Sequence, residues 1–470
     1  MTLQSRFRLA SDVALEEQGE ALFLFLPARI THAPLRLPLE LKNSLETLRV
    51  DFISSLQMED VITAGATGEG LIARYFYLRT LKRNGFLCER ISSNGFDLIE
   101  MLPAQYIEAE SLSNSAECKL SRFAYIHQES DALVLESPLS LHKMVFLDDR
   151  LLRLLSLLGR GISIGKIAEQ PSDFDEQVIR ELVEVMVSCA FVVSTEVDGG
   201  QREDALPLAT WEFHDLLFQA RSRVGRHRNP SGGTYRFLET IPRLPVMKPA
   251  MSQDVIALEE PDIDALEEND KPFSAVLEDR MSIREFADTP ISLSELGDLL
   301  FRAARIKYVQ KGDEHGDVAF RPYPGGGAIH ELEIYPLVKR CKGVDAGLYR
   351  YNPKEHQLER ISDFTVDLES IVYYAAVAMA KPEQKEGVQV LLLITSRFPR
   401  LSWKYQSMAY ATTLKGLGCL YQTLYLVATA MELAPCAIGA GDSDLFAKAT
   451  GIDYYDEPLI GEFVIGKPRE

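Results

Sequence analysis

A repeated pattern in the first two hundred residues constrains the fold of this chain most. Residues 13–30 and residues 124–141 both read as a strand, a polar turn and a second strand, and they lie 111 residues apart. Gly85-Phe86-Leu87-Cys88 aligns with Ala190-Phe191-Val192-Val193 at a similar offset of 105 residues. Two matches at nearly equal offsets predict two copies of one small α/β unit.

The second copy shows its elements most clearly. Residues 148–160 have a leucine-rich helical pattern that Gly161 ends, and Ser163-Ile164 leads into a short second helix. Ser172 is expected to cap a third helix, with Asp175 three residues on. Apolar residues share one face of this helix: Val178, Leu182, Val185, Met186 and Cys189. A strand pair, three helices and a closing strand predict a winged-helix-like unit, one at residues 1–110 and one at residues 111–197.

Charge argues against the DNA-binding interpretation of this pattern. The chain carries a formal charge of −19, which repels phosphate backbones and anionic lipid. The third helix of the second copy has five acidic residues and only Arg180 as a base: Asp173, Asp175, Glu176, Glu181 and Glu184. Its counterpart in the first copy is more basic, with Arg74, Arg79, Lys82 and Arg83. We expect the copies to bind a peptide or protein partner; mere spacers are the alternative.

Cysteine usage and hydropathy exclude several other classes. None of the six cysteines forms a CxxC pair or has a histidine at metal-ligand spacing, so we expect buried thiols and no metal site. The apolar residues 21–27 follow three glutamates and are too few for a signal peptide. Residues 405–434 are interrupted by polar side chains, so they predict a buried helix and not a membrane span. The protein is expected to be cytoplasmic.

A connector is predicted at residues 198–270. Glycine and proline interrupt it, and the acidic run at residues 259–270 reads as a solvated linker. Residues 211–223 form a short amphipathic helical pattern that includes His214, for which we expect a structural role because no nucleophile stands at a short fixed spacing.

The C-terminal domain, residues 271–470, carries the sharpest signals. Arg280 and Arg284 lie four residues apart with Ser282 between them, an arrangement that suits a phosphate. Ser292 and Glu295 form a capping box at the start of a helix. Three glycines follow Pro324, so the backbone there can lie flat against a planar ring; a plain tight turn is the alternative. Strands are predicted at residues 333–339, 347–351 and 388–395.

Six separated motifs resemble, in order and spacing, the azoline-oxidising branch of the nitroreductase superfamily. The motifs are RMSIREF, PISLSELGDLL, RPYPGGGAIHELEIYPLV, GLYRYNPKEHQL, LSWKYQSMAYATTLKGLGCLYQTLYL and APCAIGAGD, and the resemblance covers about residues 205–470. The two units in front are similar to the peptide clamps of the cyanobactin thiazoline oxidases. The shorter streptolysin-type and microcin-type oxidases are related alternatives.

The resemblance implies an α+β fold that dimerises with FMN at the interface. It assigns Arg280, Ser282 and Arg284 to the FMN phosphate and ribitol, and Pro324, Gly325 and Gly326 to backbone contacts with the flavin. Gly325 replaces the serine that is usual in the family, so a hydroxyl contact is lost. Residues 437–440, with Gly439 and Ala440, are expected near the isoalloxazine ring. Lys467 and Arg469 match loosely as further phosphate contacts.

Lys404-Tyr405 matches the catalytic motif of the family. Converting a thiazoline or oxazoline to an azole removes a proton from the α-carbon and a hydride from the β-carbon. FMN can take the hydride, and a lysine amine desolvated by Trp403 and Met408 can take the proton. Tyr405 would orient the amine or act as the base itself. Reduced FMN would be reoxidised by dioxygen.

The apolar helix predicted at residues 405–432 contains Gly416 and Gly418, which permit close approach of another helix and so suit a homodimer core; packing within one chain is the alternative. We expect an FMN-dependent oxidase of azoline rings in a ribosomally made peptide of the cyanobactin type. A general NAD(P)H-dependent reductase of quinones or nitro compounds, and a non-catalytic peptide-binding scaffold, are the competing functions.

Overall fold

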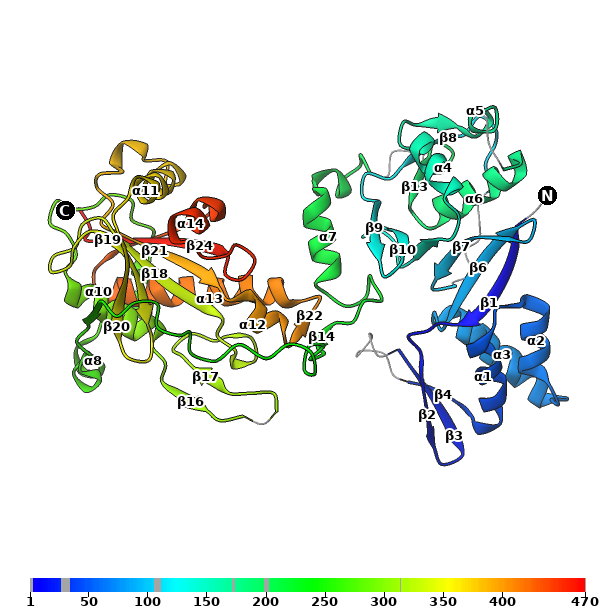
Figure 1. The fold of residues 1–470 in the computed structure, drawn as a ribbon, viewed down its shortest axis with the longest axis horizontal. Helices are drawn as coiled ribbons and strands as arrows, with labels where there is room; N and C mark the ends of the chain where they lie inside the picture. The colour runs from blue at the N-terminus through cyan, green and yellow to red at the C-terminus, as the bar shows by residue number, and fades with distance from the viewer. Residues whose placement is uncertain are drawn as a thin grey trace. The chain divides into compact units, whose positions relative to one another are not determined.

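The computed structural model describes residues 3–26, 34–104, 111–170, 174–197, 203–312 and 314–469. It divides into two compact units, Met1–Ser231 and Gly232–Glu470, and each is described by itself (Figure 1). No helix in these described ranges is both long enough and apolar enough to cross a membrane.

The repeat predicted from the sequence is visible in the first unit as two runs of elements in the same order. The first run is β1 (Gln4–Leu9), β2 (Ala14–Gln18), β3 (Ala21–Phe25), β4 (Leu35–Pro38), α1 (Lys42–Val50), β5 (Ile53–Ser54), α2 (Ser55–Thr63), α3 (Glu69–Arg83) and β6 (Leu87–Ser93). The second run is β8 (Glu117–Leu120), β9 (Tyr125–Glu129), β10 (Ala132–Glu136), β11 (Lys143–Phe146), α4 (Arg150–Leu158), β12 (Ile162–Ser163), α5 (Ile164–Ala168), α6 (Glu176–Ser188) and β13 (Val192–Ser194). The strand order β5-β1-β6 in one run matches β12-β8-β13 in the other.

The two aligned segments end their helices in the same way. Gly85, after α3, has φ 73°, and Ala190, after α6, has φ 57°. In both runs this left-handed residue turns the chain so that the next residue, Phe86 or Phe191, is buried before the strand begins. The cap predicted at Ser172 lies outside the described residues, and α6 begins at Glu176 with Asp175 as its N-cap.

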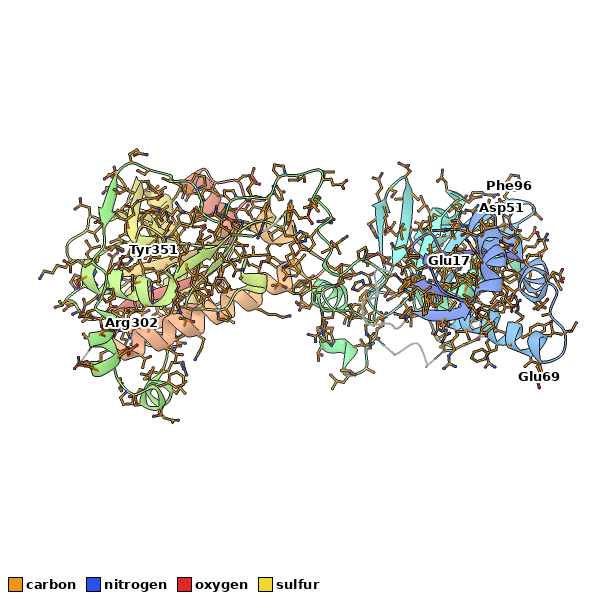
Figure 2. The ribbon with its side chains drawn as sticks, turned by 90° about the horizontal axis from the view of Figure 1, so that it is seen from below. Glu17, Asp51, Glu69, Phe96, Arg302 and Tyr351 are labelled. Carbon is orange, nitrogen blue, oxygen red and sulfur yellow. The ribbon has the colours of Figure 1, made fainter. Side chains whose placement is uncertain are left out.

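A shared sheet joins the two runs. β7 (Phe96–Leu102) pairs with β6 on one side and with β11 on the other, giving the order β5-β1-β6-β7-β11-β10-β9. Leu98 and Met101 of β7 pack into the same core as Leu182 of α6. Phe96, at the start of β7, is 65% exposed; it is labelled in Figure 2, as is Glu69 at the start of α3.

The predicted connector straddles the division between the units. Its short amphipathic helix is present as α7 (Phe213–Arg221), and Arg221 at its end pairs with the buried Glu136 at 2.8 Å. The prediction of a linker at residues 259–270 was wrong. These residues contain α8 (Ile263–Asn269), which begins because the Asp262 carboxylate accepts hydrogen bonds from two backbone amides of its first turn.

The second unit is built on an antiparallel sheet in the order β15-β20-β19-β18-β21-β24-β23. Its strands are β15 (Val255–Ala257), β18 (Leu332–Val338), β19 (Gly347–Asn352), β20 (Gln357–Asp363), β21 (Val390–Ser396), β23 (Ala434–Ile438) and β24 (Leu459–Gly466). The strands predicted at residues 333–339, 347–351 and 388–395 are therefore confirmed as β18, β19 and β21. These three are buried on both faces because helices cover the sheet on both sides, which explains the mostly apolar sequences of β18 and β21.

Helices pack on the two faces of this sheet in separate cores. α10 (Leu293–Ala304) and α13 (Ala409–Ala430) cover one face, and α11 (Val366–Ala378) and α14 (Ser443–Thr450) cover the other. α10 begins with the predicted capping box: Ser292 Oγ accepts from Glu295 N at 3.2 Å, and Glu295 Oε2 accepts from Ser292 N at 2.8 Å. In Figure 2, Tyr351 of β19 is labelled in the interior of this unit and Arg302 on α10. Helices combined with antiparallel strands confirm the predicted α+β class.

The long helix differs from the prediction in two ways. α13 begins at Ala409 and not at Tyr405, because Tyr405–Gln406 forms a strand, β22, that pairs with β14 (Gly232–Gly233). It is also not buried all round within one chain. One face packs on the sheet, but Tyr410 is 43% exposed and Leu414 is 37% exposed on the opposite face.

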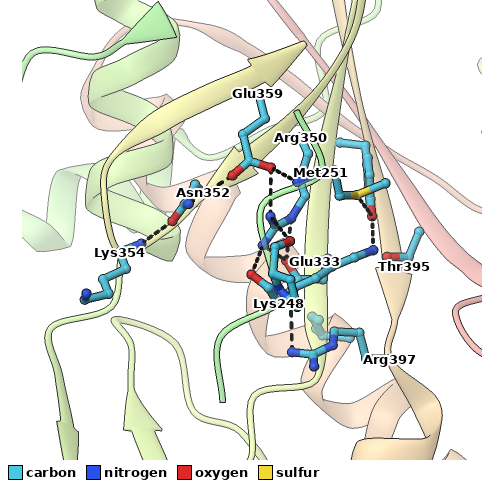
Figure 3. A network of polar contacts seen from close by, with 12 residues as sticks. Lys248, Met251, Glu333, Arg350, Asn352, Lys354, Glu359, Thr395 and Arg397 are labelled. Carbon is cyan, nitrogen blue, oxygen red and sulfur yellow. Dashed lines mark hydrogen bonds and ion pairs between the residues drawn. The ribbon is translucent and has the colours of Figure 1, made fainter. Parts of the chain in front are cut away.

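Buried arginines hold the segment at residues 241–251 across the sheet. Arg400 Nη1 donates to the Leu244 carbonyl at 2.6 Å, and Arg397 Nη2 donates to the Pro245 carbonyl at 3.0 Å. Arg350 lies between the carboxylates of Glu333 and Glu359 and also donates to the carbonyls of Lys248 and Pro249 (Figure 3). A proline-rich chain has few amide donors, so its carbonyls need side-chain donors, and the arginines supply them.

Candidate active site

The predicted catalytic pair lies against the glycine loop. A Cβ added at Gly327 would lie 2.6 Å from the Tyr405 hydroxyl and 2.9 Å from Lys404 Nζ. Gly327 has φ 59°, a left-handed conformation that glycine adopts without strain. The structure therefore brings two separate sequence motifs together at one point, and any side chain at position 327 would displace the ends of Tyr405 and Lys404.

The connector supplies the other wall around Lys404. β14 places Gly233 beside Tyr405, and a Cβ added at Gly233 would lie 3.6 Å from Lys404 Cε. The Lys404 amine lies 5.6 Å from the ring centre of Tyr235 and 5.2 Å from that of Tyr405. Among the described residues, no carboxylate pairs with this amine. Its surroundings are two aromatic rings and glycine backbone.

The Trp403 side chain fixes the position of Tyr235. Its indole Nε1 donates to the Ile241 carbonyl at 2.7 Å, and the two aromatic rings meet edge to face at 5.9 Å. On its other side Tyr235 stacks on His315 at 4.1 Å. The sequence-based reasoning missed Tyr235. The signal was the Gly232-Gly233 pair before it, which reads as a turn but forms a strand.

The glycine loop packs on buried polar groups. A Cβ added at Gly325 would lie 2.8 Å from His330 Nδ1, and one added at Gly326 would clash with the Thr412 methyl group. Burial, together with the nearby Arg321 and Arg400, lowers the pKa of His330 to about 3, so this histidine is neutral at ordinary pH. The predicted loop is thus a close backbone approach and not a free tight turn.

The predicted phosphate-binding residues form a second group, near the other end of α13. Ser282 Oγ lies 2.8 Å from the Tyr425 hydroxyl, which accepts a hydrogen bond from the backbone of Ala437. The Arg280 guanidinium lies 5.4 Å from the centre of the Tyr425 ring. Arg284 is exposed. Neither arginine is paired with a carboxylate among the described residues, so both charges are available to an anion.

Lys467 is placed beside this group but already has partners. Its backbone runs next to the segment after Arg284, where Ala287 N donates to the Lys467 carbonyl at 3.0 Å. Its amine pairs at 3.0 Å with Glu295, the same residue that closes the capping box of α10. A phosphate contact from Lys467 would have to compete with that ion pair.

Gly439 and Ala440 form a third group, in an exposed loop after β23. A Cβ added at Gly439 meets no atom within 4 Å, so the backbone there is open to a ligand. A cavity of about 180 Å³ lies beside the loop. Glu462, which the sequence-based reasoning missed, lines this cavity with a side chain that is 3% exposed. A lone glutamate in an apolar strand was the only signal for it.

The predicted site residues are not all adjacent in one chain. The glycine loop lies against Thr412 in the first turn of α13. Among the predicted phosphate-binding residues, Ser282 contacts Tyr425 near the other end of the helix. Thirteen residues of helix separate these two contacts, which is about 20 Å along the axis. His214, for which a structural role was expected, is exposed on α7 beside Glu212 and Asp215.

Comparisons with known proteins agree with this division of the chain. Residues 277–467 match the model of the nitroreductase family, and residues 118–228 match the model of the cyanobactin oxidase ThcOx. A protein of Methanocaldococcus jannaschii named as a nitroreductase is 30% identical over 187 residues, which are 40% of this chain and 85% of that protein. The trifolitoxin-processing protein TfxB of Rhizobium leguminosarum bv. trifolii is 24% identical over 152 residues, 32% of this chain and 40% of that protein.

A solved structure of a nitroreductase from Ralstonia eutropha is similar at 22% identity and a TM-score of 0.36, over 49% of this chain and 97% of the other. The sequence matches, with the antiparallel sheet and its two helical layers, identify the C-terminal unit. The match to the cyanobactin oxidase model supports the azoline-oxidase branch that the motifs predicted, and this chain belongs to the nitroreductase family.

Proposed function

We propose that this protein oxidises thiazoline or oxazoline rings to azoles in a ribosomally made peptide, using FMN. One observation carries the proposal: Lys404 and Tyr405 converge on the Gly327 backbone, with Gly233 and Tyr235 as the facing wall. An amine and a phenol beside an open backbone form a site for moving a proton on a ring-shaped substrate.

The residues present fit FMN. His330 and Thr412 fill the space beside Gly325 and Gly326, so these two glycines would offer FMN backbone contacts only, whereas Gly439 leaves an open surface without side chains. Arg280 and Arg284 carry charges that no described carboxylate neutralises, which suits a phosphate. Bound FMN would supply the hydride acceptor, and dioxygen would be the final acceptor of the two electrons.

The protein's own part of the reaction is to hold the ring and to take a proton. The Lys404 amine would accept the proton from the α-carbon, while the Tyr405 hydroxyl orients the amine or the ring nitrogen. Tyr235 and Trp403 would exclude water from one side of the amine. Loss of that proton with the hydride from the β-carbon creates the azole double bond.

A second copy of the chain would complete the site. Within one chain the glycine loop and the phosphate-binding residues lie about 20 Å apart along α13. The outward face of α13 exposes Tyr410 and Leu414. Gly418 is also exposed, and its lack of a side chain would let a helix of the second copy approach closely. In the proposed homodimer this face is covered. Each FMN lies between the phosphate-binding residues of one copy and the glycine loop of the other.

The first unit is proposed to hold the peptide. Two runs of elements with matching strand order support winged-helix-like units, and residues 118–228 match the cyanobactin oxidase model. The acidic residues of α6, with Glu176 exposed and Glu181 and Glu184 half-buried, do not suit nucleic acid. These proposed peptide clamps would keep the substrate near the flavin and raise its local concentration.

Mass spectrometry of a thiazoline peptide incubated with the FMN-loaded protein in air tests the proposal. The expected result is a loss of two hydrogens from each ring that reacts. A protein whose flavin is bleached rapidly by NADPH, with no change in the peptide, would instead be a general reductase, the function that the similarity to the M. jannaschii protein favours. A protein that cannot be loaded with FMN would be a peptide-binding scaffold.

A further inference from the structure

Glu462 is a buried acid that the proposed reaction leaves without a role. It lies in β24 opposite Ile438 of β23, and its side chain is 3% exposed. Its Oε2 atom is buried and has no hydrogen-bond partner among the described residues. A buried polar atom without a partner destabilises a fold by about 1–3 kcal/mol, so such an atom calls for a ligand or another explanation.

The Glu462 side chain lines the cavity beside the loop of residues 439–441. Residues 438–441, Ser443 and residues 459–461 line the cavity together with Tyr410. A Cβ added at Gly441 would lie 2.6 Å from Glu462 Oε1, so the loop passes directly over the acid. The Glu462 amide donates to the Tyr421 hydroxyl at 2.7 Å, which fixes the backbone of the strand at this point.

The charged groups around Glu462 disfavour its ionised form. Burial, and after it the negative charge of Asp442, raise the pKa of Glu462 to about 8. Asp442 is the N-cap of α14 and accepts from Leu445 N, while α13 contributes the neutral phenols of Tyr410 and Tyr421. No described cation pairs with Glu462. At neutral pH the group is therefore a carboxylic acid, with one O–H to donate.

We propose that Glu462 is a cofactor-binding residue, which hydrogen-bonds to the polar edge of the flavin that lies on loop 439–441. This inference rests on the proposed function. Two observations point to a ligand at this place: an unpartnered oxygen that is buried in the cavity wall, and an open backbone at Gly439 next to it. A flavin ring offers both hydrogen-bond acceptors and donors along one edge, so it can satisfy a neutral acid.

The test is the dissociation constant of FMN, measured from pH 6 to pH 9.5 by quenching of flavin fluorescence. In the wild type, affinity should fall about tenfold as pH rises through about 8, because the ionised acid loses its donor. Glu462→Gln keeps a donor at every pH and should lack this fall. Glu462→Leu should bind about tenfold more weakly throughout.

Asp298→Asn is the matched control. Asp298 on α10 is also a partly buried acid whose pKa is raised by burial, but it does not line the cavity. Its variant should keep the wild-type pH profile, which includes the ionisations of FMN itself. Equal profiles for wild type and Glu462→Gln would overturn the inference and leave the proposed function standing. A wild type that binds no FMN at any pH would overturn both.

Discussion

Replacing Gly327 by alanine should separate activity from stability. The added methyl group would lie 2.6 Å from the Tyr405 hydroxyl and 2.9 Å from Lys404 Nζ. Ordinary contacts of this kind are about 3.5 Å, so both side-chain ends must move by roughly 1 Å. Both ends are flexible, so the fold should tolerate the shift, and the left-handed backbone adds a cost of about 1–2 kcal/mol. A displacement of that size in catalytic groups costs on the order of a hundredfold in rate.

Gly451→Ala is the control for the backbone cost alone. Gly451 has φ 70° at the end of α14, and a Cβ added there meets no atom within 4 Å. Both variants should lose about 1–2 kcal/mol in urea unfolding. Only Gly327→Ala should lose azole formation, measured by mass spectrometry under saturating FMN.

Two results would refute this reasoning. Wild-type turnover by Gly327→Ala would mean that the Gly327 neighbours play no part in the chemistry. Equal losses of turnover in the two variants would mean that general destabilisation, and not the displaced Lys404 and Tyr405, lowers the activity.

Three further predictions follow from the same contacts. Lys404→Ala should keep FMN bound, seen in the visible spectrum, yet lose azole formation; unchanged turnover would remove Lys404 from the mechanism. Arg350→Met leaves the buried carboxylates of Glu333 and Glu359 without their shared cation, so urea unfolding should show a loss of about 3–5 kcal/mol, and a loss below about 1 kcal/mol would contradict the network. Because the pKa of Glu462 is raised from 4.5 to about 8, its neutral form stabilises the fold below about pH 4.5, and this contribution is lost as pH rises to about 8. Wild-type stability should therefore fall relative to Glu462→Gln by on the order of 4 kcal/mol between pH 5 and pH 8 in urea unfolding, whereas parallel curves would exclude the raised pKa.

Local sequence signals predicted many of the elements of this protein. The Ser292 and Glu295 capping box marked the start of α10, because a cap is made by residues three apart. Gly161, which has φ 74°, marked the end of α4, because a left-handed residue after a helix is a local requirement. Continuous apolar sequence marked the buried strands β18 and β21.

These local signals could not predict contacts between segments that are far apart in the sequence. Residues 405–406 looked like the start of the apolar helix, but they pair with Gly232–Gly233, and Thr234 Oγ1 donates to Gln406 Oε1 across 172 residues of sequence. Lys467 looked free to bind phosphate, but the fold places Glu295 3.0 Å from its amine. Periodicity and spacing describe only near neighbours along the chain, so they carry no information about such pairs.

The sequence by itself determined the repeated front unit, the α+β class and the residues that define the family motifs, because each depends on a short stretch of chain. Only the tertiary structure decided that Lys404 and Tyr405 meet Gly327, that Tyr235 faces them, and that Glu462 lies buried behind the Gly439 loop. The physical reason is that a side chain's neighbours and its burial are set by the packing of segments far apart in sequence, and it is this packing that gives a lysine or a glutamate its chemistry.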